Sequence, residues 1–318
     1  MNKDNSSRLI KLVIPALLCQ VLWGSAIPSI KTAYKLFSIV SGESMSQLLM
    51  AGVRFLLAGV LAVIFGSIPE KKLLVPKKSS IPMITALAMV QTVAQYFFFF
   101  IGVANSDGMK SAVIQGCSTF IAILFAVFVF RQEKMTLRKL IGCIVGFAGI
   151  VVINMNGGKL GRLNLTGDGF VIISTSAGAV AASMIKKFSQ KENPVTLNGY
   201  QFMLGGLVLI AIGLIGGGKL RPVSGMAWVL MLYMGFLSAA AYSIWSILLK
   251  NYPVSRVTVY SFMNPVFGVI FCALLLKEEN AFTLPQLIIS LALVCAGILI
   301  VNLRGKNNAG AVLTESRK

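Results

Sequence analysis

The organisation of the chain is decided by a segment that occurs twice, as SAVIQGCSTFIAILFAVFVFRQEKMTLRKLIGCIVGFAGIVVIN (residues 111–154) and as VTVYSFMNPVFGVIFCALLLKEENAFTLPQLIISLALVCAGILIVN (residues 257–302). The two copies align with only two single-residue insertions, and Glu133 matches Glu279 at an offset of 146 residues. Further pairs nearer the start of each half keep a similar spacing. They are Gly59 with Gly206 and Arg54 with Gln201 at an offset of 147, and Ile30-Lys31 with Ile185-Lys186 at 155.

The repeated segment belongs to a chain that is apolar almost throughout. Mean hydropathy is +0.82, and 56% of the residues are hydrophobic against 12% charged, which excludes a soluble globular domain. A helix of roughly 20 apolar residues crosses a bilayer. Stretches of about this length predict ten transmembrane helices, at 11–34, 46–66, 81–103, 109–130, 138–155, 168–186, 196–216, 226–249, 256–276 and 284–303.

The two halves are predicted to be inverted relative to each other. Each holds five spans, and because five is odd, the second half enters the membrane from the opposite side. The charges agree, since loop 131–139 has four basic residues and one acidic, whereas its counterpart 277–283 has one basic and two acidic. Inverted repeats are typical of secondary transporters, in which one half rocks against the other around a central site.

The basic residues predict the orientation. With a cytoplasmic N-terminus, twenty of the twenty-nine Lys and Arg residues fall in cytoplasmic segments and eight on the other side. Positive charge is retained inside, so both termini are predicted to be cytoplasmic, in a multi-pass protein of the cell membrane. The net charge of +19 is spread along the loops, which argues against nucleic acid as a partner.

Several short motifs resemble one family. They are WGSAIPSIK (23–31), RFLLAG (54–59), EKMT (133–136), GDGF (167–170), NP (264–265) and EENAFT (278–283). In this order and with this repetition they resemble the EamA-type transporters of the drug/metabolite transporter superfamily. Thr119 departs from the pattern, because it replaces the proline typical of the fourth helix, while Pro265 stands at the equivalent place in the ninth.

The resemblance implies an all-α fold of ten helices in two inverted five-helix repeats, and export of small metabolites. The first EamA-like repeat is predicted at 11–155 and the second at 168–303. Cytoplasmic tails are predicted at 1–10 and 304–318.

Ionisable residues inside a membrane are costly and so are the first candidates for function. Arg54 lies in the second span, where it attracts an anionic substrate group, snorkels to the interface or satisfies carbonyls of a neighbouring helix. Lys31 is expected to snorkel to the interface. No Asp or Glu lies deep in a predicted span, and the chain has no histidine. The sequence therefore predicts no enzyme, cofactor or metal site.

Neutral polar side chains at one-turn spacings predict a central cavity. Such groups need partners or water in hydrocarbon, and interhelical hydrogen bonding is the competing explanation. Trp23 is expected either to stack on a substrate or to anchor its helix at the interface. The other cavity candidates are Gln95, Gln115, Thr119, Tyr242, Tyr260 and Asn264.

The predicted function is secondary transport of a small amino acid-like or amphipathic metabolite by alternating access, with export as the expected direction. Arg54 and Lys31 keep open an alternative, exchange of phosphorylated or carboxylated metabolites. A non-transporting scaffold is the third possibility. Gly142 and Gly146 form a G-x-x-x-G motif that serves either packing within the bundle or homodimerisation.

Overall fold

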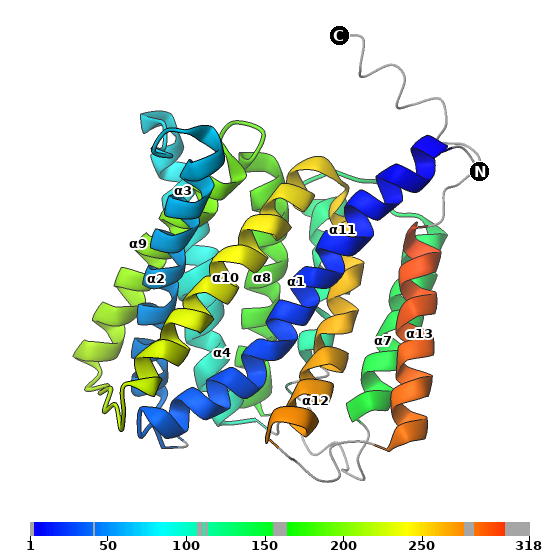
Figure 1. Ribbon diagram of the computed structural model, residues 1–318. Coiled ribbons are helices and arrows are strands. Elements are labelled where there is room, and N and C mark those ends of the chain that lie inside the picture. Colours follow the sequence, from blue (N-terminus) through cyan, green and yellow to red (C-terminus); the bar gives the residue numbers. More distant parts are fainter. Residues whose placement is uncertain are drawn as a thin grey trace.

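The computed structural model is a bundle of helices in which the start of the first long helix and the end of the last lie at the same end of the molecule (Figure 1). It describes residues 3–40, 42–106, 111, 114–154, 164–276 and 283–302. The long helices are α1 (Lys3–Leu36), α2 (Ser44–Glu70), α7 (Leu137–Asn154), α8 (Phe170–Phe188), α9 (Pro194–Ile215), α10 (Met226–Asn251) and α13 (Leu284–Asn302).

The remaining spans are continuous runs of shorter helical pieces. The third span consists of η1 (Lys78–Ser80), α3 (Ile81–Leu87), the π-helical η2 (Ala88–Ala94) and α4 (Gln95–Ala104). The fourth contains α6 (Ser118–Leu124) and η3 (Phe125–Val129), and the π-helical η4 (Leu165–Gly169) leads into α8. The ninth joins α11 (Val254–Thr258), the 3₁₀ turn η5 (Val259–Phe262) and α12 (Met263–Leu276).

These elements confirm the ten-helix prediction. Seven of them are long and apolar enough to cross a membrane, and Ile114–Val129, α7 and the run Val254–Leu276 occupy the other three predicted positions. One boundary differs, because α1 begins at Lys3 and continues through residues predicted as a tail. Residues 155–163 and 303–318, and Glu279 with its loop, lie outside the described residues.

Equivalent helices of the two halves make equivalent contacts. Helix α1 of the first half packs against α10 and α12 of the second. Its counterpart α8, of the second half, packs against α4 and α6 of the first. The two most extensive contacts of the described bundle join a helix to its own counterpart, α2 to α9 and α7 to α13, and α2 also packs against α10 as α9 packs against η2. A pattern in which elements meet their own equivalents is that of a two-fold axis. The inverted repeat read from the sequence is therefore also the symmetry of the packing.

Glycines on the axis allow α2 and α9 to touch backbone to backbone. A Cβ placed on Gly59 would lie 2.5 Å from the carbonyl oxygen of Gly199, and one on Gly52 would lie 2.8 Å from that of Gly206. Gly52 and Gly199 are 147 residues apart, as are Gly59 and Gly206, so each contact is the counterpart of the other. Because the numbering rises along one helix as it falls along the other, the two helices run antiparallel.

The G-x-x-x-G motif of α7 lies inside the bundle. A Cβ on Gly142 would lie 2.9 Å from the carbonyl oxygen of Gly297 on α13, and one on Gly146 would meet the ring of Phe262 at 2.4 Å. The hydroxyl of Ser290 also donates to the carbonyl oxygen of Gly149 at 2.8 Å. This motif therefore serves internal packing, and its small residues give no support to a homodimer.

A buried carboxylate holds the loops together at the end where α1 begins. Glu192, between α8 and α9, is 8% exposed and accepts hydrogen bonds from the backbone N–H groups of Lys77 (3.0 Å) and Asn193 (2.9 Å). Burial alone would raise the pKa of Glu192, but these hydrogen bonds outweigh it, and the pKa of the carboxyl is lowered in the folded protein.

Replacing Glu192 with glutamine is expected to destabilise the protein at neutral pH and to matter less in acid. Because its pKa is lowered on folding, the carboxylate contributes stability above its unfolded pKa of about 4.3, and the contribution is lost as pH falls through the folded value. Melting temperatures in detergent between neutral and acidic pH would measure the narrowing gap between wild type and E192Q. The exposed Glu70, changed to glutamine, is the control, and a gap for E192Q that stays constant with pH would contradict the assignment.

Candidate functional site

A cavity of about 640 Å³ lies between the two halves. Both halves contribute to its wall, largely through residues that the repeat makes equivalent. These equivalent pairs are Trp23 with Gly178, Ile30 with Ile185, Tyr96 with Tyr242, Phe99 with Trp245, Gln115 with Ser261, Ser118 with Asn264, Thr119 with Pro265, and Ala122 with Gly268. A site at the repeat interface is the location expected for the binding site of an inverted-repeat transporter.

Four aromatic rings meet where the axis passes beside the cavity. Phe55 and Phe202 stack with centroids 4.9 Å apart, and the hydroxyls of Tyr96 and Tyr242 share a hydrogen bond of 2.9 Å. The remaining contacts repeat each other, since Phe55 lies 4.5 Å from Tyr96 and Phe202 lies 4.9 Å from Tyr242, between ring centroids. Such contacts fix the two halves to each other beside the cavity.

Arg54 is a buried cation in the cavity wall. It is 6% exposed, its Nε donates to the hydroxyl of Ser238 at 2.9 Å, and its guanidinium carbon lies 5.3 Å from the centroid of Phe55. The other half repeats this arrangement without the charge, because Thr92 Oγ1 donates to Gln201 Oε1 at 2.7 Å. The charge is therefore a feature of one half only, at a position where the fold itself requires no charge.

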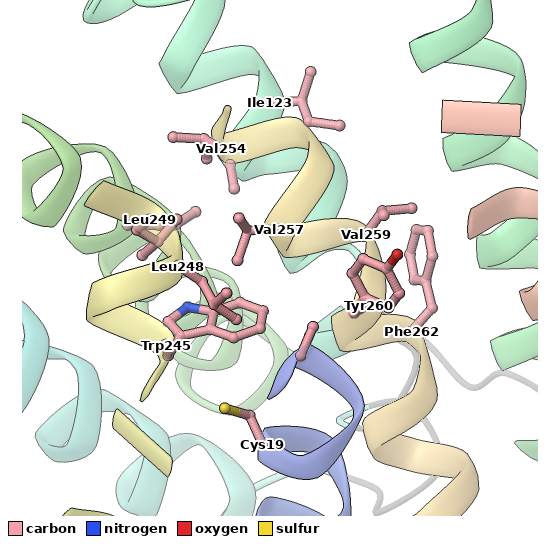
Figure 2. Close-up of a cluster of buried hydrophobic side chains, with 14 of the residues drawn as sticks. Cys19, Ile123, Trp245, Leu248, Leu249, Val254, Val257, Val259, Tyr260 and Phe262 are labelled. Carbon is pink, nitrogen blue, oxygen red and sulfur yellow. The ribbon is translucent and has the colours of Figure 1, made fainter. Parts of the chain in front are cut away.

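The cavity contains seven of the eight residues predicted for the site, Trp23, Arg54, Gln95, Gln115, Thr119, Tyr242 and Asn264. Tyr260 is placed elsewhere. It lies in the 3₁₀ turn η5, is 3% exposed and packs in the apolar core beside Val259 and Phe262 (Figure 2). The one-turn spacing to Asn264 assumed a regular α-helix, and the tighter 3₁₀ turn places the ring on another face.

Further residues line the cavity besides these. Tyr96 and Gln91 share with Gln95 the polar, one-turn spacing of the third span that predicts a cavity, and Tyr96 is equivalent to Tyr242 at an offset of 146. Phe99 also lines the cavity, although its phenylalanine run looks like lipid-facing bulk in the sequence. Gly178 has no side chain, so a search for polar or aromatic groups passes over it, and only its repeat partner Trp23 marks the position.

Three polar atoms of lining residues are buried without a hydrogen-bond partner among the described residues. They are Nε1 of Trp23, Oε1 of Gln91 and Oδ1 of Asn264. Burial of an unpaired polar group is costly, so these atoms call for water or a ligand. This favours a cavity over interhelical hydrogen bonding as the explanation of these polar side chains. Thr119 is different, because its hydroxyl already donates to the carbonyl oxygen of Thr258 at 2.8 Å.

Apolar side chains close the bundle at the end where α1 begins. Figure 2 shows Trp245, Leu248 and Leu249 of α10 facing Val254 and Val257 of α11, and each of them is at most 6% exposed. At the opposite end the exposed Lys31 lines the cavity. The cavity therefore extends toward the end away from Lys3.

Charged side chains connect the helices at the outer edge of this closed end. The carboxylate of Glu133 accepts hydrogen bonds from the backbone N–H of Ser255 at 3.0 Å and from the Ser255 hydroxyl, and Lys139 Nζ lies 2.6 Å from it. Lys186 donates to the carbonyl oxygen of Tyr252 at 2.9 Å. Glu133 thus joins the first half to the second.

Comparison with known proteins places this arrangement among transporters. The model of the EamA-like transporter family matches residues 10–155 and 165–303. An uncharacterized transporter of Archaeoglobus fulgidus is 29% identical over 293 residues, covering 89% of this chain and 96% of its own. A probable amino-acid metabolite efflux pump of Escherichia coli is 25% identical over 276 residues, covering 83% and 86%. A crystal structure at 16% identity has the same fold, with a TM-score of 0.72 over 96% of this chain and 98% of that one.

Proposed function

Because the chain belongs to the EamA-like transporter family, we propose that it is a secondary transporter that exports a small amino acid-like or amphipathic metabolite by alternating access. The observation that carries this proposal is the cavity between the two halves, lined by repeat-equivalent residues and closed by buried apolar side chains at the end where α1 begins. Such a cavity opens to the other side when the halves rock. A scaffold has no need for unpaired polar atoms in a central cavity.

The predicted orientation in the membrane decides which side the cavity faces. With both termini in the cytoplasm of the cell, the closure formed by Trp245, Leu249 and Val257 faces the cytoplasm, and the cavity faces outward. In the inward-facing state this closure has to separate, and the opposite end has to close. Relatives bearing the name of amino-acid metabolite efflux pumps support an amino acid-like substrate.

A second candidate is the exchange of phosphorylated or carboxylated metabolites. Two cationic residues, Arg54 and Lys31, line the cavity, whereas Asp and Glu are absent from its described lining. A positive cavity of this kind attracts anions. The two candidates differ in the net charge of the substrate. An amino acid carries a positive ammonium group besides its carboxylate, whereas a phosphorylated or carboxylated metabolite is a net anion.

Uptake into proteoliposomes separates these candidates. Radiolabelled amino acids and, separately, sugar phosphates are offered with and without an imposed pH gradient. Saturable uptake of an amino acid is the expected result, and its response to the gradient reports coupling to protons. Counterflow of sugar phosphates instead would establish the second candidate. Absence of any flux, with protein that is folded and inserted, would overturn both.

A further inference from the structure

The equivalent helices α1 and α8 lie in the same register against the opposite half. Cys19 Sγ of α1 donates to the carbonyl oxygen of Ala241 on α10 at 3.3 Å. Ser174 Oγ of α8 donates to the carbonyl oxygen of Gln95 on α4 at 2.7 Å. Cys19 and Ser174 are 155 residues apart, and Gln95 and Ala241 are 146 apart, so the two bonds are equivalent. Each residue of α1 can therefore be compared with the residue of α8 that follows it by 155 positions.

The two helices nevertheless contribute different lengths to the cavity wall. Helix α8 lines the cavity over residues 174–185, whereas α1 lines it only over residues 23–31. Thr175 belongs to the lining, but its counterpart Gln20 does not. Gln20 lies one turn before Trp23, on the same face of α1. The lining face of α1 therefore stops one turn short of the length that α8 contributes.

The closure at the end where α1 begins accounts for this difference. Figure 2 shows Cys19, the residue before Gln20, pointing toward Trp245 of the closure, and both side chains belong to one buried cluster. At the same end Lys186 of α8 donates to the carbonyl oxygens of Leu249, at 3.3 Å, and Tyr252, at 2.9 Å, where α10 ends. The closure thus covers the part of α1 that contains Gln20.

Equivalent residues at the other end have different surroundings. Lys31 is the counterpart of Lys186, but it is exposed and lines the cavity. Helix α8 packs against α10, whereas the equivalent pair, α1 and α4, has no comparable packing among the described residues. Rocking that opens one end and closes the other exchanges the surroundings of the two halves. After this exchange Gln20 has the surroundings that Thr175 has here.

The side chain of Gln20 is poorly matched to its buried position. It is fully buried, and both Oε1 and Nε2 lack a hydrogen-bond partner among the described residues. Burial of an unpaired polar group is costly, and the cost is removed when the group meets water or a ligand. A carboxamide both donates and accepts hydrogen bonds, so it can pair with the ammonium or the carboxylate group of an amino acid.

We propose that Gln20 is a substrate-binding residue of the inward-facing state, in which its carboxamide enters the cavity that opens toward the end where α1 begins. This inference rests on the proposed function and adds to it a binding residue that the outward-facing cavity does not contain. Thr175 and Gln20 occupy equivalent places in the wall, one in each state.

Replacing Gln20 with leucine separates substrate binding from packing. Leucine removes the unpaired polar atoms, so the melting temperature of the purified protein is expected not to fall. Transport at low substrate concentration is expected to fall about tenfold, which corresponds to the loss of one hydrogen bond. Gln20→Thr introduces the residue of the equivalent position and should retain part of the transport. Unchanged transport in Gln20→Leu, or an equal fall of melting temperature and transport in both variants, would overturn the inference.

Cysteine labelling tests from which side Gln20 is reached. Gln20→Cys, with the five native cysteines replaced by serine, is exposed to a membrane-impermeant thiol reagent from either side of vesicles while the transported amino acid is present. Labelling is expected only from the side opposite to that which labels Gln115→Cys, at an exposed residue of the cavity wall. Leu18→Cys is the matched control on α1. Leu18 is apolar and 45% exposed on a membrane-spanning helix, so its variant should be labelled from neither side.

The outcomes separate this inference from the proposed function. Labelling of Gln20→Cys from the side that labels Gln115→Cys, or from neither side while transport continues, would overturn the inference and leave transport standing. A protein that transports no amino acid contradicts the proposed function instead. Labelling decides the inference in that case, because access of a thiol to water is measured without transport: label from the opposite side supports it, and absence of label overturns it.

Discussion

Replacing Arg54 with glutamine is expected to lower transport of a carboxylate-bearing substrate by about 10- to 100-fold, the range that the loss of a hydrogen bond to a charged group of about 1.5–3 kcal/mol produces. The buried guanidinium supplies the fixed positive charge of the cavity wall. Glutamine is the residue that the fold accepts at the equivalent position, Gln201, where it takes a hydrogen bond from Thr92. The variant is therefore expected to fold.

Initial rates of uptake in proteoliposomes, with size-exclusion profiles of the purified protein, measure this effect. Arg54→Lys keeps the charge but loses the planar donor set, so it should retain part of the activity. Loss confined to anionic substrates would support the exchange of carboxylated or phosphorylated metabolites. Unchanged transport of every substrate in Arg54→Gln would refute a role for this cation in binding.

Replacing Gly59 with leucine is expected to prevent stable folding. An added Cβ would lie 2.5 Å from the carbonyl oxygen of Gly199 and 2.7 Å from the backbone nitrogen of Met203, so α2 and α9 have to separate. Overpacking a core typically costs about 1–3 kcal/mol, and a clash with backbone atoms belongs at or above the upper end of this range.

Melting temperature and monodispersity in detergent measure this effect. Val60→Leu is the matched control, since Val60 is the next residue of α2 and 39% exposed. Gly59→Ala should fall between the two. A melting temperature of Gly59→Leu equal to that of wild type would show that the two helices do not meet at this position.

The fold was predictable because its main features are periodic. Apolar runs separated by charged loops locate the spans, and the offsets of 146 and 147 residues identify which residues of the two halves are equivalent. That the equivalent residues Tyr96 and Tyr242 contact each other is seen only in the structure. Charge asymmetry between equivalent loops predicts the inversion. All of these signals are carried by many residues at once, so local irregularities do not remove them.

The candidate site was less predictable, because it depends on rotation about each helix axis. Polar spacing selected Tyr260 together with Asn264, but the 3₁₀ turn at Val259–Phe262 breaks the α-helical period between them. Gly178 escapes any search for side chains. The contact of Glu133 with Ser255 joins a turn of the first half to the start of α11 in the second, 122 residues away, which neither local pattern nor repeat spacing indicates.

The contacts on the axis impose a rule of self-compatibility. A side chain that meets its own equivalent has to be a suitable neighbour for itself: Phe55 and Phe202 satisfy this by stacking, and Tyr96 and Tyr242 because a phenol both donates and accepts. A guanidinium only donates, and two of them near the axis would repel each other. An assembly of two identical halves would carry arginine at both positions or at neither.

Joining the halves in one chain frees each to diverge, so Arg54 keeps its charge while Gln201 has none. The charge of Arg54, which has no counterpart at Gln201, is therefore a property that the fused chain has and a symmetric pair of half-length chains would lack.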